Sequence, residues 1–218
     1  DVVVPSNIKV TVADQVYIDR TGLPSAMIAQ LVRVAAFQNP EFYRAQAMRL
    51  PTFGKPRVVS CAELHPRHVA LPRGCFDEAV EVLTEHGAQA ELDDQRSDGT
   101  PLPNTVQFLG ELRPPQQRAF ESLTAHDTGV LAATTAFGKT VVASALIGHR
   151  CRNTLVLVHR RELLDQWVER LKTFLQIDPK QIGTIGGGRR KPTGVIDVAL
   201  IQSLVRNGEV DDIVADYG

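Results

Sequence analysis

The chain has 218 residues, of which 43% are hydrophobic and 22% are charged, and its formal net charge is −1. This length accommodates one large or two small domains, and the composition is ordinary for a water-soluble protein. No apolar run approaches the roughly 20 residues of a membrane-spanning helix, and the sequence shows neither the basic nor the apolar segment of a signal peptide. These features argue against a membrane protein and against a membrane partner.

The cysteines and histidines argue against disulfide and zinc sites. Cys61, Cys75 and Cys151 are odd in number and far apart, and none belongs to a C-x-x-C pair. The segment His65-Pro-Arg-His68 has no second ligand pair nearby, so surface histidines are expected there. The sequence therefore predicts a cytoplasmic protein with reduced cysteines.

Charge is distributed unevenly along the chain. Residues 20–73 contain eight basic and two acidic side chains, whereas residues 77–98 contain eight acidic side chains and one arginine. A basic block in a neutral chain is typical of a surface that binds a polyanion, although most charged runs are only solvated surface. We interpret Arg44, Arg49 and Arg57 as candidate nucleic-acid contacts.

Residues 1–95 are predicted to form a small α+β domain. Alternating apolar residues indicate strands at 8–12 and 15–18, joined by a tight turn. Ser25 is the expected N-cap of a helix that runs to residue 36, and Asn39-Pro40 starts a second helix. Further expected elements are strands at 57–61, 68–71 and 88–92 and a helix at 76–83. Residues 96–111 are predicted to be a linker with a lead-in strand at 105–109, and residues 112–218 a second domain.

The second domain is organised around a candidate phosphate-binding loop. The apolar run 130–133 predicts a buried strand, and helical spacing of apolar residues begins again at Val141. Between them the pattern G-x-x-x-x-G-K-[ST] is matched by Gly138, Lys139 and Thr140, with Ala133 at the first glycine position. Backbone N–H groups of such a loop bind phosphates, the lysine adds a positive charge, and the threonine hydroxyl is a Mg²⁺ ligand. The predicted ATP-binding residues in this loop are Ala136, Phe137, Gly138, Lys139 and Thr140, with Thr140 also the predicted Mg²⁺ ligand.

The elements around the loop predict a parallel, doubly wound α/β sheet. Helices are expected at 114–123 and 163–174, and strands at 154–158 and 195–201, the first of them buried on both faces. Ligands of such sheets bind at the carboxyl ends of the strands, where polar or basic residues follow here. Between these strands lies a glycine-rich segment with three cations, for which a solvated hairpin is the plainer alternative. The predicted nucleic-acid contacts of this domain are Arg160, Arg161, Arg189, Arg190, Lys191, Gln202 and Ser203.

These motifs together resemble superfamily 2 DNA helicases and translocases, most closely the XPB-like proteins, including bacterial restriction-type helicase subunits. Residues 112–116, Leu-Arg-Pro-Pro-Gln, are similar to a family element whose glutamine recognises adenine, with Pro115 in place of an aromatic residue. Residues 133–140 match motif I, with Ala136 where many members have glycine. Residues 155–167 match motif Ia, and residues 201–204 lie where motif Ib occurs. The resemblance implies a RecA-like first lobe that binds ATP and DNA, with Gln116 near the base, and a front domain like the damage-recognition-like domain of XPB-like proteins.

The resemblance also implies a fragment of a larger motor. The sequence ends before the strand expected to carry the family's Asp-Glu box, which holds Mg²⁺ and activates water, and before the second lobe with its arginine finger. Such a finger is worth about 10³–10⁵ in rate, so these 218 residues are expected to bind ATP and DNA without hydrolysing ATP. The implied partners are DNA, the second helicase lobe, and other subunits of a repair or restriction complex.

Two other functions fit the residues. The first is a non-catalytic DNA-recognition module whose activity lies in the basic front domain. The second is a P-loop kinase for a small molecule, for which the sequence offers no acceptor pocket or lid.

Overall fold

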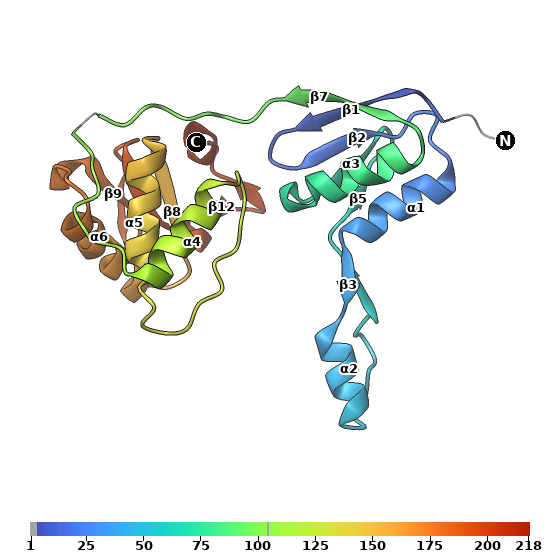
Figure 1. The fold of residues 1–218 in the computed structure, drawn as a ribbon. Coiled ribbons are helices and arrows are strands. Elements are labelled where there is room, and N and C mark those ends of the chain that lie inside the picture. Colours follow the sequence, from blue (N-terminus) through green and yellow to red (C-terminus); the bar gives the residue numbers. More distant parts are fainter. Residues whose placement is uncertain (1–3, 104) are drawn as a thin grey trace. The chain divides into compact units, whose positions relative to one another are not determined.

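The computed structural model describes residues 4–103 and 105–218. The chain forms two compact units, Asp1–Arg96 and Ser97–Gly218 (Figure 1). Asn104, which falls in the predicted linker, lies outside the described residues. Among the helices that the structure describes, none has the length and apolar character needed to cross a bilayer.

Unit 1 contains a five-stranded sheet in the order β5-β6-β2-β1-β7. Strands β1 and β7 are parallel, and the other neighbours are antiparallel. Helices α1 and α3 cover the sheet, and Met27, Leu31 and Leu83 pack against alternate residues of the strands such as Val10 and Ile18. The elements are β1 (Asn7–Val12), β2 (Val16–Asp19), α1 (Ser25–Val34), β5 (Glu63–Leu64), β6 (His68–Leu71), α3 (Phe76–Glu85) and β7 (Gln89–Asp94).

The predicted elements of unit 1 are largely confirmed, with two corrections around α1. Ser25 is the first residue of the helix and not its cap, because the N-cap residue is Pro24. The helix ends at Val34, two residues before the predicted end, because Ala36–Gln38 forms strand β3 and pairs with β4 (Val58–Ser60). That pairing joins residues about 20 positions apart, so local periodicity did not indicate it.

Strands β3 and β4 and helix α2 form a projection that we call the arm, residues 36–60. In Figure 1 the arm extends away from the sheet of unit 1, with α2 (Pro40–Ala47) near its end. Asn39 joins the helix to the returning chain: its side chain accepts a hydrogen bond from Glu41 N (3.0 Å) and donates one to Pro56 O (2.8 Å). Phe42 and Ala45 are the buried residues of α2.

Unit 2 contains a four-stranded sheet in the order β10-β9-β11-β8. Strands β8, β11 and β9 are parallel, and β10 is antiparallel to β9. Alternate strand residues such as Val158 and Val198 face the helix side, where Leu171 packs, while Ala199 and Ile185 face the other side. The elements are α4 (Pro114–Thr124), α5 (Lys139–Arg150), β8 (Thr154–Val158), α6 (Arg161–Phe174), β9 (Ile182–Gly186), β10 (Arg189–Lys191) and β11 (Ile196–Leu200). This mixed α/β sheet with parallel strands confirms the predicted fold class.

Three strand predictions for unit 2 need correction. Residues 130–133 form no strand, and Val130 is 92% exposed, because no strand in the described part of the chain lies beside them to share hydrogen bonds. Strand β8 lies at one edge of its sheet and is not buried on both faces, since Leu157 is 50% exposed. The predicted strand at 105–109 is reduced to a single bridge between Phe108 and Leu175.

Buried polar groups fasten the C-terminal segment, which contains β12 (Val205–Arg206) and β13 (Glu209–Val210), to the sheet. Asp197 in β11 is fully buried and accepts hydrogen bonds from Tyr217 Oη, Gly194 N and Thr193 N. Burial and the bond to Asp197 raise the pKa of Tyr217 well above its usual range. Asn153, also buried, donates to Asp216 O (2.8 Å) and accepts from Thr100 N (2.7 Å).

Candidate functional site

The loop at residues 133–140 ends at the first turn of α5. Helix α5 begins at Lys139, and Gly138 precedes it in the left-handed conformation, with φ of 92°. A Cβ atom at this position would also collide with the amide nitrogen of Gln116, so the site requires glycine. The first N–H groups of a helix have no acceptor within it, and the positive end of the helix dipole lies there. The end of the loop is therefore suited to an anion.

The loop is tied to the start of α4 through the carbonyl of Phe137. Arg113 Nη2 and Gln116 Nε2 donate to this oxygen at 2.5 and 2.8 Å. The other end of the Gln116 amide accepts from Arg113 N at 2.9 Å, and the residue is only 3% exposed. In this structure the glutamine predicted to recognise adenine serves to position the loop.

Lys139 lies inside the loop that it terminates. Its Nζ donates to Ala133 O at 2.9 Å and to Thr134 O at 3.0 Å. These two carbonyls hold the ammonium group against the first residues of the loop. Thr140, the next residue, is half-buried, and its backbone carbonyl accepts from Ser144 Oγ at 2.9 Å.

Ala136 adds a second left-handed residue to the loop, with φ of 66°. An L-residue in this conformation is strained by roughly 1–2 kcal/mol, whereas glycine is not. Successive backbone N–H groups in alternating right- and left-handed conformations form an anion-binding concavity. Ala136 and Gly138, on either side of Phe137, give the loop left-handed residues of the kind that such a concavity contains.

The donor set fits a magnesium nucleotide. Mg²⁺ in nucleotide sites is held by one or two protein oxygens together with phosphate oxygens and water, so the hydroxyl of Thr140 is a sufficient start. Within residues 4–103 and 105–218, no group of three His, Cys, Asp or Glu side chains could hold a metal ion by itself. A metal that arrives with a phosphate ligand is the arrangement that these residues support.

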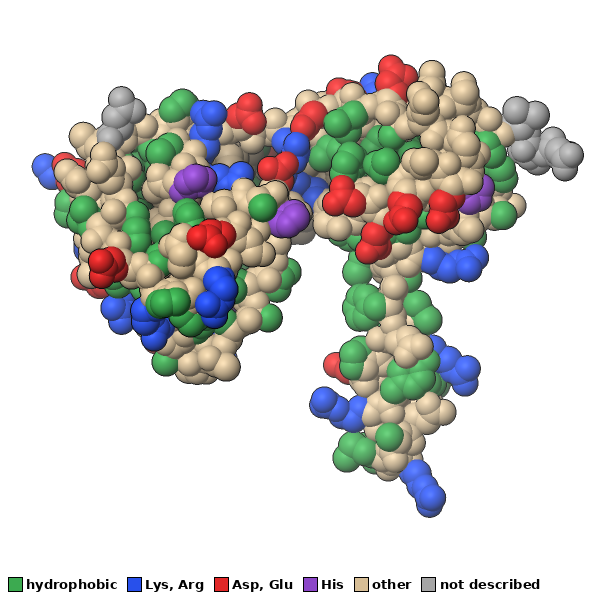
Figure 2. Space-filling view, viewed as in Figure 1, with side chains coloured by type: hydrophobic (Ala, Val, Ile, Leu, Met, Phe, Trp, Pro, Cys, Tyr) green, Lys and Arg blue, Asp and Glu red, His purple; other side chains and the backbone are tan. Residues whose placement is uncertain are grey.

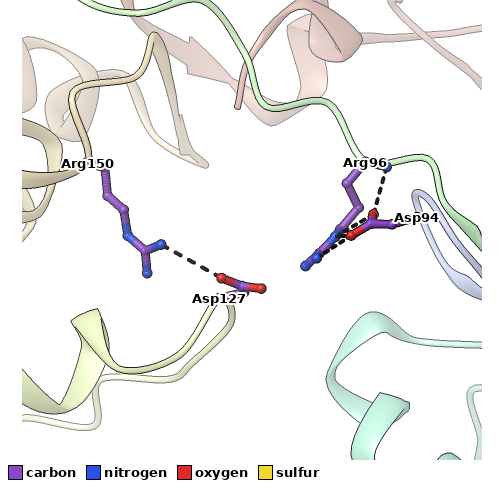
Figure 3. Close-up of polar contacts among 4 residues, drawn as sticks. All are labelled: Asp94, Arg96, Asp127 and Arg150. Atoms are coloured by element: carbon purple, nitrogen blue, oxygen red, sulfur yellow. Dashed lines mark hydrogen bonds and ion pairs between the residues drawn. The ribbon is translucent and has the colours of Figure 1, made fainter. Parts of the chain in front are cut away.

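Arg150, the last residue of α5, holds the segment that leads into the loop. Its Nη2 donates to His126 O at 2.7 Å, and its Nη1 lies 3.8 Å from Asp127 Oδ1 (Figure 3). The turn after α4 is thereby attached to the far end of α5.

The carboxyl ends of three parallel strands bring several predicted residues together. Val158 of β8 lies beside Leu200 of β11, so the residues that follow the two strands are neighbours. Gln202 Nε2 donates to His159 O at 3.3 Å across this edge. Arg161 reaches the turn after β9, where a Cβ on Gly187 would be 3.3 Å from its Nε. Arg160, Arg161, Gln202 and Ser203 therefore follow the carboxyl ends of neighbouring strands and share one edge of the sheet.

The three cations after β9 do not act as one group. They form strand β10 of a hairpin, so successive side chains point to opposite faces. Arg190 Nη2 lies 2.6 Å from Asp211 Oδ2, and the pKa of Asp211 is lowered by the hydrogen bond from Ile213 N and by Arg190. Arg190 also lines a hollow of about 570 Å³ together with Ser203 and Arg206, whereas Arg189 and Lys191 are on the other face of the strand.

Arg44, Arg49 and Arg57 lie in the arm of unit 1 and not in unit 2. Arg44 is within α2, Arg49 follows its end, and Arg57 lies 5.4 Å from the ring centre of Phe42. They make up a second, separate group of candidate contacts.

Arg113 is a site residue that the sequence did not single out. It stands before two prolines at the start of α4, and only its reach of 24 positions to Phe137 reveals a role. The buried residues Asn153 and Asp197 were missed as well, because their partners Asp216 and Tyr217 lie 63 and 20 positions away in the sequence.

Comparisons with known proteins identify relatives of this chain. Residues 109–216 match the family described as type III restriction enzyme, res subunit. The DNA 3'-5' translocase XPB2 of Sulfurisphaera tokodaii is 29% identical over 122 residues, which are 56% of this chain and 27% of the relative. Rad25 of Halobacterium salinarum is 35% identical over 109 residues, which are 50% of this chain and 18% of the relative. The chain thus spans about a quarter or less of the length of these curated relatives.

The fold is also that of a solved helicase. The UvsW helicase from bacteriophage T4 superposes with a TM-score of 0.57 at 16% identity, covering 90% of this chain and 75% of that chain. A second structure of T4 UvsW gives a TM-score of 0.58 at 16% identity, with 92% of this chain and 44% of that chain covered. At this identity the likeness establishes the fold of the chain.

Proposed function

We propose that the chain is a member of the XPB-like superfamily 2 helicases and forms the ATP- and DNA-binding front part of an ATP-dependent DNA motor. ATP hydrolysis and movement along DNA are proposed for the whole protein, since the chain corresponds to 27% and 18% of its curated relatives. Three unpaired cysteines favour a cytoplasmic location.

The observation that carries the proposal is the geometry of the loop. Lys139 Nζ is held by two carbonyls at the start of the loop, and Phe137 O accepts hydrogen bonds from the side chains of Arg113, which precedes α4, and of Gln116 in its first turn. The ammonium group would exchange the carbonyls of Ala133 and Thr134 for the β- and γ-phosphate oxygens. Bound Mg²⁺ would neutralise charge on these phosphates. The hydroxyl of Thr140, the residue directly after Lys139, would hold the Mg²⁺ ion.

DNA is proposed to run along the edge of unit 2 formed by the carboxyl ends of β8, β9 and β11, which we call the strand-end edge. Arg160 and Arg161 supply cations for phosphates, while Gln202 and Ser203 supply neutral hydrogen-bonding groups, as in backbone contacts generally. Arg190 can join them only when its ion pair with Asp211 opens. Closure of a second lobe on ATP and its reopening after hydrolysis would make and release these contacts in alternation.

Steady-state ATP hydrolysis with and without DNA tests the proposal. A protein extended through the regions that the relatives have beyond the match should hydrolyse ATP, faster with DNA, and Lys139→Ala should abolish the activity. These 218 residues alone should bind ATP without turnover, because they would lack the proposed second-lobe arginine, worth about 10³–10⁵ in rate. An extended protein whose hydrolysis ignores DNA would contradict the motor, and turnover by the 218 residues would contradict the need for the rest.

A further inference from the structure

The arm of unit 1 exposes six large apolar side chains. Phe53 is 99% exposed, and five further large apolar residues of the arm are between 40% and 63% exposed. Exposed apolar side chains that gather on one projection commonly mark a binding surface. The five further residues are Phe37, Tyr43, Met48, Leu50 and Val58.

The arm is also the most cationic part of unit 1. Residues 36–60 contain Arg44, Arg49, Lys55 and Arg57 but only one acid, Glu41, which gives a local charge of +3. Figure 2 shows these blue side chains along both sides and at the end of the arm, with green apolar side chains between them. Such a surface attracts a negatively charged partner and repels a positively charged one.

A tight turn at residues 52–55 exposes Phe53 on the stretch of the arm that returns from α2 to β4. Lys55 N donates to Thr52 O at 3.1 Å, and Gly54 in the turn has φ of 75°. Phe53 therefore presents its ring to solvent beside a lysine, although burial of an aromatic ring is favourable. The arm therefore presents an exposed aromatic ring two residues from a lysine.

Arg49 occupies a backbone position that favours glycine. It ends α2 with φ of 54°, while Leu50 N donates to Ala45 O at 2.8 Å and Arg49 N donates to Gln46 O at 3.0 Å. Helices usually close in this way with glycine, because other L-residues are strained there. The arginine brings a guanidinium group to the arm at the expense of that strain, and strain of this kind tends to occur at functional positions.

We propose that the arm binds single-stranded nucleic acid, with Phe53 stacked on a base and Arg49 and Lys55 on the flanking phosphates. Single-strand sites combine aromatic platforms with cations that follow the backbone, which is the combination found here. A duplex hides the faces of its bases, so Phe53 selects a single strand, a bulge or a junction. Nucleic acid as the partner rests on the proposed function, but this contact is distinct from the strand-end edge and independent of ATP.

Fluorescence anisotropy of a labelled 15-nucleotide single strand, with the 218-residue chain and no nucleotide, tests the inference. Phe53→Ser should weaken binding about 5- to 150-fold, the range for one stacked base. Leu64→Ser is the matched control, because Leu64 is 58% exposed in β5, outside the arm, and its replacement should leave affinity unchanged.

Arg49→Gly removes the cation without endangering the fold, because glycine is favoured in the left-handed conformation. It should weaken binding and reduce the slope of log affinity against log salt by about 0.7, the value for one phosphate contact of a single strand. Arg67→Gln, at an exposed cation outside the arm, is the control and should change neither quantity.

A third variant, Arg160→Gln with Arg161→Gln, separates this inference from the proposed function. Weaker binding in this variant alone, with Phe53→Ser unaffected, would overturn the inference and leave the strand-end site intact. Weaker binding in Phe53→Ser alone would support the arm and contradict the strand-end site. The inference would be overturned if Phe53→Ser lost affinity for single strand and duplex equally. It would also be overturned if Phe53→Ser lost binding to phosphatidylserine vesicles while its DNA binding stayed unchanged, or if the chain bound no DNA at all.

Discussion

The strained backbone at Ala136 predicts both the sign and the size of the stability change caused by Ala136→Gly. The left-handed conformation, with φ of 66°, costs an alanine about 1–2 kcal/mol and a glycine almost nothing. Glycine also loses about 0.4–1 kcal/mol more chain entropy on folding. Ala136→Gly should therefore change the free energy of unfolding of unit 2 by between about 0 and +1.6 kcal/mol, which is a stabilisation.

Ala132→Gly supplies the matched control, since Ala132 is exposed, lies in the same segment and does not have positive φ. Only the entropy effect applies there, so this variant should be destabilised by about 0.4–1 kcal/mol. Urea unfolding followed by the fluorescence of Trp167, the single tryptophan and a residue of α6, reports unit 2 alone. If both variants lose the same stability, Ala136 is not strained in solution and the argument from its φ fails.

Three further substitutions test particular contacts. Gln116→Ala should lower the stability of unit 2 by about 1 kcal/mol or more, because Arg113 N loses its acceptor, and the same urea assay measures it; unchanged stability with weaker ATP binding would indicate a base contact only. Tyr217→Phe should cost about 1–3 kcal/mol at pH 8 by removing a donor to buried Asp197. Burial and that bond raise the pKa of Tyr217, so the contribution of its hydroxyl to the free energy of unfolding is present below pH 10.0 and declines above it. The two proteins should therefore converge in stability as the pH rises, and a constant difference up to pH 11 would contradict the bond. Arg96, through its side-chain bond, lowers the pKa of Asp94 from 3.8 to about 2 (Figure 3), so its contribution is present above pH 3.8 and lost as pH falls toward 2; circular dichroism during acid unfolding should show a shallower pH dependence for Asp94→Asn, and an unaltered curve would refute the assignment.

Local sequence signals predicted the parts of the site that depend on local structure. Gly138 followed by Lys139 located the start of α5, and the apolar run at 195–201 located β11. The glycines before Arg189 indicated a hairpin, which β9 and β10 form. In each case a short segment contains both the element and its boundary, so neighbours in space were not needed.

Features that depend on neighbouring strands were predicted less well. Residues 130–133 have the composition of a buried strand, yet a strand also needs a partner beside it, and the sequence of the segment does not encode that partner. The apolar run of β8 likewise gave no sign that this strand would be outermost, because strand order is a property of the whole sheet.

Long-range polar contacts were the least predictable. Arg113 and Phe137 are separated by 24 positions, and Asp197 and Tyr217 by 20, so no periodic pattern connects them. The arm depends on pairing of β3 with β4 across the whole of α2, whereas the sequence predicted only the helix, nearby cations and an unpaired strand at 57–61.

Isothermal calorimetry of the chain with ATP and Mg²⁺ tests the central claim that residues 133–140 bind nucleotide phosphates. The account predicts a binding heat for the wild-type protein that disappears in Lys139→Ala and persists in Lys172→Ala, which removes a lysine paired with Glu169 on the surface of α6. Absence of wild-type heat, or an equal heat in Lys139→Ala, would contradict it.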